Sequence, residues 1–464
     1  MSHTKLLPEM LPHQRALIDT SFEEGQYESG LIAFDQLRVA AKCYPSPALV
    51  SQVLYLALYT PPPNEQKVTE PGSPSKMASR QQRLAHMPTQ AASFAAQRLL
   101  MSLITSTPPD ILLRGLPSYS APGATVLNEE ADSYVAKEAR CIRQAKDCWS
   151  ILKEGFIHEA TAPPITTRWQ RRGSRDDLDA AHAQPPLIVA ENAWPVLEWL
   201  IRLFQEDELR HSGYCYSPLL LSEIPLPRDN TGARWETDAA LDIVFYSLSQ
   251  TSERRRHCGI QLLTMLIRLW AARHLDTHMF IASVYKRVST CQEVQLLALL
   301  DNLGAVPSTM EFRIIICQKL LSDMSLESSS RGRPRPQART QPRAVRGAQS
   351  SQTIIDAPST PVAGPSSNIS PSGSMPFILQ LLRDESYTTT EERPKSLIAH
   401  VKFHLLMAYG AYQYGLKPAD VSWAQALRSG EILDAINNVF DRLGDAKALG
   451  DTLKVHVSQW ITVI

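Results

Sequence analysis

Apolar residues recur along this chain at three- and four-residue spacings, which is the period of an amphipathic α-helix. The first such face consists of Leu31, Phe34, Leu37 and Ala41. Ser46-Pro47 then indicates the start of a second helix, with Ser46 as its N-cap and Pro47 at the first helical position, where the missing N–H costs nothing. The two helices together predict an αα-hairpin.

A longer helix is expected between Asn128 and Leu152. Asn128 can serve as its N-cap, Trp149 and Leu152 lie on its apolar face, and Gly155 suits the C′ position just beyond its end. Residues 239–321 carry the densest helical pattern of the chain.

The succession of helices predicts an all-α protein. An irregular HEAT- or armadillo-like helical repeat and a helical bundle are both compatible with it, because no repeated motif of fixed period is present. A period-2 series of strands is also missing from the pattern. The C-terminal pattern continues to Ile464, which favours a docked C-terminal helix.

Proline- and serine-rich stretches divide the helical blocks, and long disordered loops are expected there. The expected organisation is an N-terminal helical hairpin at 1–60, a disordered loop at 61–90, a central helical domain at 91–324, a disordered basic linker at 325–373, and a C-terminal helical segment at 374–464. With 464 residues, the chain is longer than the roughly 250–300 residues that one core usually serves.

The composition is that of a globular protein, with 44% hydrophobic and 20% charged residues and a formal net charge of zero. Nucleic-acid binding would therefore depend on a local basic patch. The seven cysteines are widely spaced and form no CxxC pair, so we interpret them as mostly buried thiols in a reducing compartment. We expect neither a secretory signal nor a membrane-spanning helix.

Signals for catalysis or metal binding are weak, and we expect a non-enzymatic protein without cofactor or small-molecule substrate. The 20 glycines form no phosphate-binding loop. Two histidine pairs have the four-residue spacing that can chelate a metal on a helix, namely His274 with His278 and His400 with His404. Neither pair has an indicated third ligand, so half-exposed helix positions explain them better.

The most distinctive feature is a basic stretch without acidic residues from Arg331 to Arg346. Its Arg-Gly-Arg-Pro core at 331–334 resembles an AT-hook, although Ser328-Ser329-Ser330 stand where that family has further basic residues. The resemblance covers only four to six residues and implies contact with an A·T-rich minor groove. The DNA-contact candidates are Arg331, Gly332, Arg333, Pro334, Arg335, Arg339, Arg343 and Arg346. A localisation signal or a solvated linker is the alternative.

Short modification and docking motifs accompany the basic stretch. Ser73 begins a Ser-Pro-Ser-Lys sequence that resembles the consensus of proline-directed kinases, and Thr360 and Ser370 precede prolines. Phosphate at these positions would add negative charge that can pair with arginine. Thr353-Ile354-Ile355-Asp356 resembles a SUMO-interacting motif, with Ile354, Ile355 and Asp356 as candidate contacts.

Together these features favour a nuclear helical scaffold, a subunit of a protein complex that acts on DNA or chromatin. In this hypothesis the helices bind other protein subunits, and residues 325–373 supply weak DNA contact or regulation. One alternative is a cytoplasmic adaptor in trafficking or complex assembly. Another is an enzyme whose site is assembled by the fold, for which a deep polar pocket near His274 and His278 would be needed.

Overall fold

The computed structural model describes residues 8–61, 87–117, 133–161, 186–211, 213, 215–227, 232–329, 373–384, 395–416, 419–441 and 446–462. Within these ranges the regular structure is helical, and β-structure is limited to isolated bridges between Glu9 and Tyr44 and between Arg234 and Leu275. The predicted all-α fold is confirmed, while the choice between a helical repeat and a bundle stays a prediction. The chain forms two compact units, Met1–Leu303 and Gly304–Ile464.

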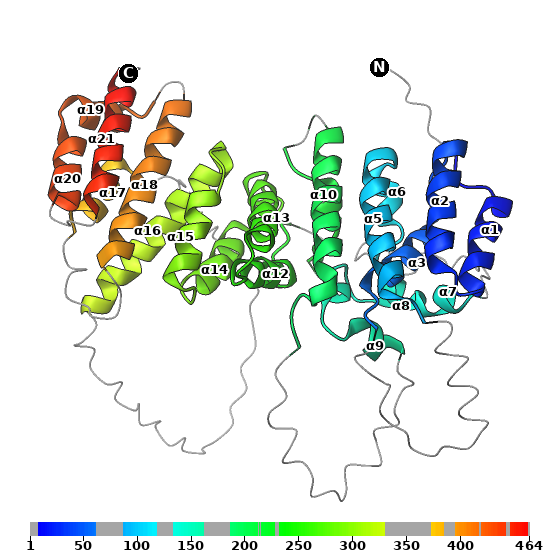
Figure 1. Ribbon diagram of the computed structural model, residues 1–464. Helices are drawn as coiled ribbons and strands as arrows, with labels where there is room; N and C mark the ends of the chain where they lie inside the picture. Colours follow the sequence, from blue (N-terminus) through cyan, green and yellow to red (C-terminus); the bar gives the residue numbers. More distant parts are fainter. Residues whose placement is uncertain are drawn as a thin grey trace, which may run out of the picture. The chain divides into compact units, whose positions relative to one another are not determined.

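The helices of the first unit follow one another as separate, short to medium-length elements (Figure 1). They are α1 (Pro12–Glu23), α2 (Tyr27–Ala41), α3 (Pro47–Leu58), α5 (Gln90–Ser106), α6 (Pro109–Leu113), α7 (Tyr134–Glu138), α8 (Arg140–Gln144), the 3₁₀ turn η2 (Ser150–Leu152), α9 (Phe156–Thr161), η4 (Glu191–Ala193), α10 (Trp194–Arg210), α11 (Pro218–Ser222), α12 (Asp238–Leu248), α13 (Glu253–Ala271), α14 (Thr277–Val288) and α15 (Glu293–Asn302).

The N-terminal hairpin forms where the sequence predicts a pair of helices. The Ser46 hydroxyl accepts a hydrogen bond from the Leu49 backbone N–H at 3.4 Å, which confirms Ser46 as the N-cap of α3. On α2, Leu31 and Phe34 are buried as expected. Ala41 is exposed and Arg38 is buried in its place, because the Arg38 side chain reaches across to α5.

Four helices of the first unit pack side by side in the order α2, α5, α10 and α13. Figure 1 shows α2, α5 and α10 standing nearly parallel. Helices α10 and α13 run in the same direction. Arg254 pairs with Glu198 near the start of both helices, and Arg268 pairs with Glu208 near their ends. The other faces of these helices pack against α3 and α12, which places the core of the unit behind the row.

The prediction of a single helix between Asn128 and Leu152 is wrong for the part that the structure describes, where α7, α8 and η2 are separate elements. Asn128 itself lies outside the described residues, and Ser133 caps α7 instead through a 3.1 Å bond from Ala136 N–H. The chain then turns, because the Asp147 carboxylate accepts the backbone N–H of Ser150 at 2.6 Å. Such local side-chain bonds compete with helical hydrogen bonds. Gly155 has a positive φ of 79°, as a C-terminal residue of this kind requires.

The second unit is built around α18. They are α16 (Pro307–Ser329), α17 (Met375–Arg383), α18 (Lys395–Gly415), α19 (Val421–Arg428), α20 (Glu431–Phe440) and α21 (Lys447–Ile461). The buried face of α18 packs against α16 and α21, and α17 packs against α20. Residues 307–324, which the sequence pattern groups with the central helices, therefore lie in the same unit as the C-terminal helices.

All seven cysteines are free, and five of them are buried. Cys215 is exposed and Cys291 is half-buried, so the interpretation of most cysteines as core residues holds. Among the described residues, no helix is both long and apolar enough to cross a bilayer.

Candidate partner-binding surface

The residues that the sequence singles out for DNA contact, phosphorylation and SUMO binding all lie outside the described residues. These are the candidates at 331–346, Ser73, Thr360 and Ser370, and the segment 353–356. They stay predictions.

The two histidine pairs occupy different settings. His274 precedes the N-cap of α14, Asp276, so only His278 lies on the helix and the two residues do not share a helical face. The His274 ring lies against Tyr216 at a centroid distance of 4.3 Å, and burial together with Arg234 lowers the pKa of His274. His400 and His404 do share α18, where His404 is buried. The described residues contain no group of three potential metal ligands.

Helix α2 presents apolar side chains on its outer side as well as on its buried side. Ile32 is 58% exposed and Val39 is 61% exposed, and their seven-residue spacing places them on one strip of the helix. Asp35 lies on the same strip between them. Exposure of these two apolar side chains to water is unfavourable. Because they lie on one strip, they are a candidate contact for another protein.

Helix α5 carries the matching feature next to α2. Phe94 is 54% exposed, and Arg98 follows it one turn later on the outer side. The two helices run in the same direction, because Glu28 accepts a hydrogen bond from Thr89 at their N-terminal ends while Arg38 meets Ser102 further along. We name Ile32, Val39, Phe94 and Arg98 the α2–α5 surface.

Arg38 fixes the spacing of the two helices beneath this surface. Its guanidinium donates to Ser102 Oγ at 2.9 Å and to Ser106 Oγ on α5, and it pairs with Asp35 on its own helix at 2.5 Å. Arg38 is buried, and its planar guanidinium bonds to residues of both helices, which holds them at a fixed spacing. The α2–α5 surface is therefore held on a preorganised support.

The neighbouring part of the row is polar. Glu198 on α10 accepts from Arg202 on the same helix at 3.0 Å and from Arg254 on α13 at 2.5 Å. Two guanidinium groups share one carboxylate there, which leaves a local excess of positive charge. An acidic residue of a partner would find a favourable environment beside these arginines.

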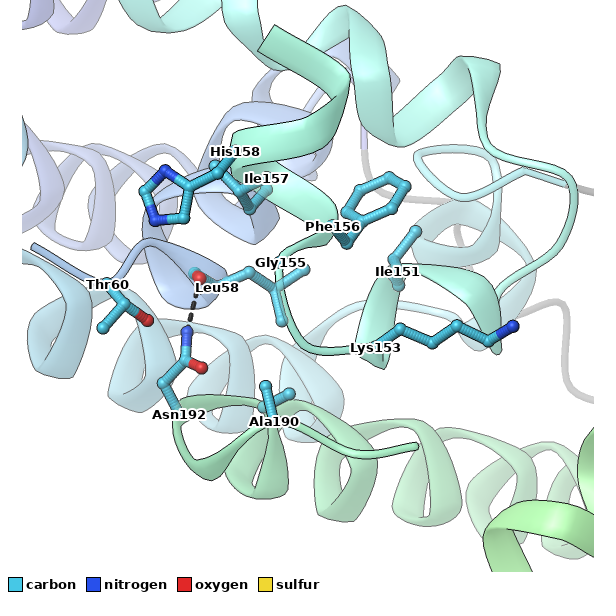
Figure 2. Close-up of a pocket in the computed structure, with 11 residues that line it drawn as sticks. Leu58, Thr60, Ile151, Lys153, Gly155, Phe156, Ile157, His158, Ala190 and Asn192 are labelled. Atoms are coloured by element: carbon cyan, nitrogen blue, oxygen red, sulfur yellow. Dashed lines mark hydrogen bonds between the residues drawn. The ribbon is translucent and has the colours of Figure 1, made fainter. Parts of the chain in front are cut away.

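A small pocket lies elsewhere in the unit, at the C-terminal end of α3. Figure 2 shows Leu58, Phe156, His158 and Asn192 around it, with the Asn192 amide donating to the Leu58 carbonyl. Gln97 donates to the neighbouring Ala57 carbonyl at 3.0 Å. These polar groups satisfy the last carbonyls of α3, a structural task. Its cavity volume of about 30 Å³ is far below the range for small-molecule sites.

The sequence pattern did not identify the α2–α5 surface, but it contained a signal. Ile32 directly follows Leu31 and therefore falls outside the apolar face that Leu31 begins. Large apolar residues off the expected face are the feature to look for. Phe94 gives no comparable signal, because its exposure depends on how α5 packs.

Comparison with known protein families, with curated proteins and with solved structures finds no match for this chain.

Proposed function

We propose that the protein is a non-catalytic helical scaffold, a subunit of a nuclear complex that acts on DNA or chromatin. Its helices bind other protein subunits, and the 325–373 segment adds weak DNA contact or regulation. The observation that supports partner binding is the α2–α5 surface, where three large apolar side chains are more than half exposed.

The physical argument rests on where free energy becomes available on binding. Covering a side chain such as Phe94 or Ile32 can contribute on the order of 1.5–3 kcal/mol when it is fully removed from water. Aromatic residues and arginines contribute most to protein interfaces, and Phe94 and Arg98 are one turn apart. Because Arg38 already orders the support, little conformational entropy is lost on association.

The geometry of the surface favours a helical partner. Two parallel helices with apolar strips can receive a third amphipathic helix along their length. The acidic residues Glu28 and Asp35 lie on α2, while the basic residues Arg98, Arg202 and Arg254 lie on α5, α10 and α13. A partner helix with basic residues along one flank and acidic residues along the other is complementary to this arrangement.

The test is quantitative affinity purification of the full chain from nuclear extract with cross-linking, comparing wild type with Phe94→Ser and Ile32→Ser. The matched control is Val294→Ser on α15, which removes a similarly exposed apolar side chain elsewhere. We expect the same set of partners to be depleted in both surface variants and retained in the control. The affinity for the purified partner should fall roughly ten- to hundredfold.

Two results would contradict the proposal. If the α2–α5 variants retain every partner at wild-type level, the surface does not bind subunits. If a fluorescent fusion stays in the cytoplasm both with and without substitution of the arginines at 331–346, the nuclear part of the proposal is wrong.

A further inference from the structure

Glu223 carries a buried carboxyl whose hydrogen bonding is poorly satisfied. It directly follows α11 and has no exposed surface. Within the described part of the chain neither carboxylate oxygen meets the geometry of a full hydrogen bond, and only weak contacts from Cys148 and Ser222 reach them. A fully ionised carboxylate in this position would bear a large desolvation cost, so the setting favours the neutral acid.

The groups around Glu223 come from three segments. Asp147 and Cys148 approach from the turn before η2, and Trp149 Nε1 donates to the Glu223 backbone carbonyl at 3.4 Å. Arg234, from the segment before α12, donates to the carbonyls of Leu221 and Ile224. Its guanidinium is thus occupied by the backbone on either side of Glu223 and not by the carboxyl.

At the start of α11, by contrast, the carboxyl of Asp207 has several hydrogen-bond partners. Asp207 on α10 accepts from the Ser217 hydroxyl at 2.6 Å and from the Leu219 backbone N–H at 2.9 Å, and it pairs with His211. The Asp207 carboxyl thus holds the start of α11 through these hydrogen bonds. Glu223, at the end of α11, has no equivalent set of donors.

The electrostatic environment agrees with this geometry. The pKa of Glu223 is raised to about 7, chiefly by burial. The negative charge of Asp147 acts in the same direction, while hydrogen bonds from the Cys148 thiol and backbone and from the Ser222 hydroxyl act against it. Burial lowers the pKa of Arg234, and the negative charge of ionised Glu223 partly offsets this effect. Burial also raises the pKa of the Cys148 thiol.

We propose that Glu223 is a proton-operated latch, whose neutral carboxylic acid keeps residues 217–227 packed on the 147–152 turn and whose ionisation opens this segment. The open form exposes the carboxylate to water and uncovers Cys148, which is fully buried in the closed form. The latch is independent of the proposed scaffold function.

The direction of the pH dependence follows from linkage. In the closed form Glu223 holds its proton up to about pH 7, and in the open form it loses the proton near the ordinary value of 4.5. Opening therefore releases a proton between these values, and the opening equilibrium should rise about tenfold per pH unit there. The total increase is roughly 300-fold, and it levels off above pH 7 because both forms are then ionised.

The experiment is hydrogen–deuterium exchange of the full chain between pH 5 and pH 8.5, corrected for the intrinsic exchange rate at each pH. Wild type is compared with Glu223→Gln, which mimics the neutral acid, and with Glu223→Met, which removes the polar group. The control is Glu236→Gln, an exposed glutamate in the neighbouring segment. We expect residues 217–227 and 147–152 to open increasingly with pH in wild type and in the control, and independently of pH in both Glu223 variants.

A second measurement compares alkylation of Cys148 in wild type and Glu223→Gln at the same pH of 7.5. The thiol should react faster in wild type, because its segment opens more often. The proposal is overturned if exchange in residues 217–227 is independent of pH in wild type, if either folded Glu223 variant keeps the wild-type pH dependence, or if Cys148 reacts at the same rate in both proteins.

Discussion

Trp460 of α21 lies directly against Gly410 of α18, and its indole ring occupies the space that a Cβ atom at position 410 would need. Trp460 also contacts Trp423 on α19 at a centroid distance of 5.5 Å, and Trp423 contacts Tyr409 at 5.4 Å. Helices α18, α19 and α21 thus pack through these aromatic rings, and Gly410 allows the close approach because it has no side chain.

Replacing Gly410 with Ala should destabilise the second unit. The added methyl group must displace Trp460 and, through it, Trp423, and such overpacking costs roughly 1–3 kcal/mol. We expect a lower midpoint of thermal unfolding, measured by tryptophan fluorescence. Gly415→Ala, at a position where a Cβ atom meets nothing within 4 Å, is the matched control and should leave the midpoint nearly unchanged. Equal midpoints for both variants would contradict the contact.

Replacing Asp207 with Ala should loosen α11 from α10. The change leaves the buried Ser217 hydroxyl and the Leu219 N–H without their acceptor, which costs roughly 2–4 kcal/mol in unfolding free energy. Denaturant unfolding measures the loss. Glu206→Ala, at the half-exposed neighbouring position, should change stability by no more than about 0.5 kcal/mol. A similar small effect for Asp207→Ala would show that α11 does not depend on this carboxylate.

Lys402 is a buried lysine that closes the C-terminal end of α17. Its ammonium group donates to the Leu382 carbonyl at 2.7 Å and to the Asp384 carbonyl at 2.9 Å. Lys402→Met keeps the apolar stem but leaves these carbonyls without that donor, so we expect a loss of roughly 1–3 kcal/mol. The half-exposed pair of Lys454 and Asp441 offers the comparison, and Lys454→Met should cost less than about 1 kcal/mol. Reversal of this order in denaturant unfolding would refute the assignment.

The basic stretch should give DNA binding a strong salt dependence. Replacing its six arginines with glutamine removes the positive charges that release counterions from DNA, so the slope of log K against log salt should fall by up to about 5. The six positions are Arg331, Arg333, Arg335, Arg339, Arg343 and Arg346. Fluorescence anisotropy with an A·T-rich duplex measures the slope, and Arg202→Gln with Arg254→Gln is the control for arginines on the helices. An unchanged slope would exclude the stretch as the DNA contact.

Much of the helical content could be predicted from the sequence, because its signals are local. The spacing of Leu31 and Phe34 and the Ser46-Pro47 start depend on residues within one or two helical turns. The break at Asp147–Ser150 was missed for the opposite reason, since the apolar pattern continues through it while a single side-chain hydrogen bond turns the chain.

The candidate sites depended on contacts that no local pattern contains. The α2–α5 surface exists because Arg38 joins α2 to Ser102, 64 residues later, and leaves Ile32 and Phe94 on the outside. The environment of Glu223 depends on Trp149, which is 74 residues away along the chain.

The sequence by itself determined that this protein is built of helices and where several of them begin, because helix formation is decided by neighbouring residues. Only the tertiary structure decided that α16 packs with α18, that the carboxyl of Glu223 is buried with poorly satisfied hydrogen bonding, and that Gly410 must remain small beneath Trp460. Burial and pairing are properties of segments brought together from distant parts of the chain, and the spacing of residues along one segment carries no information about its partner.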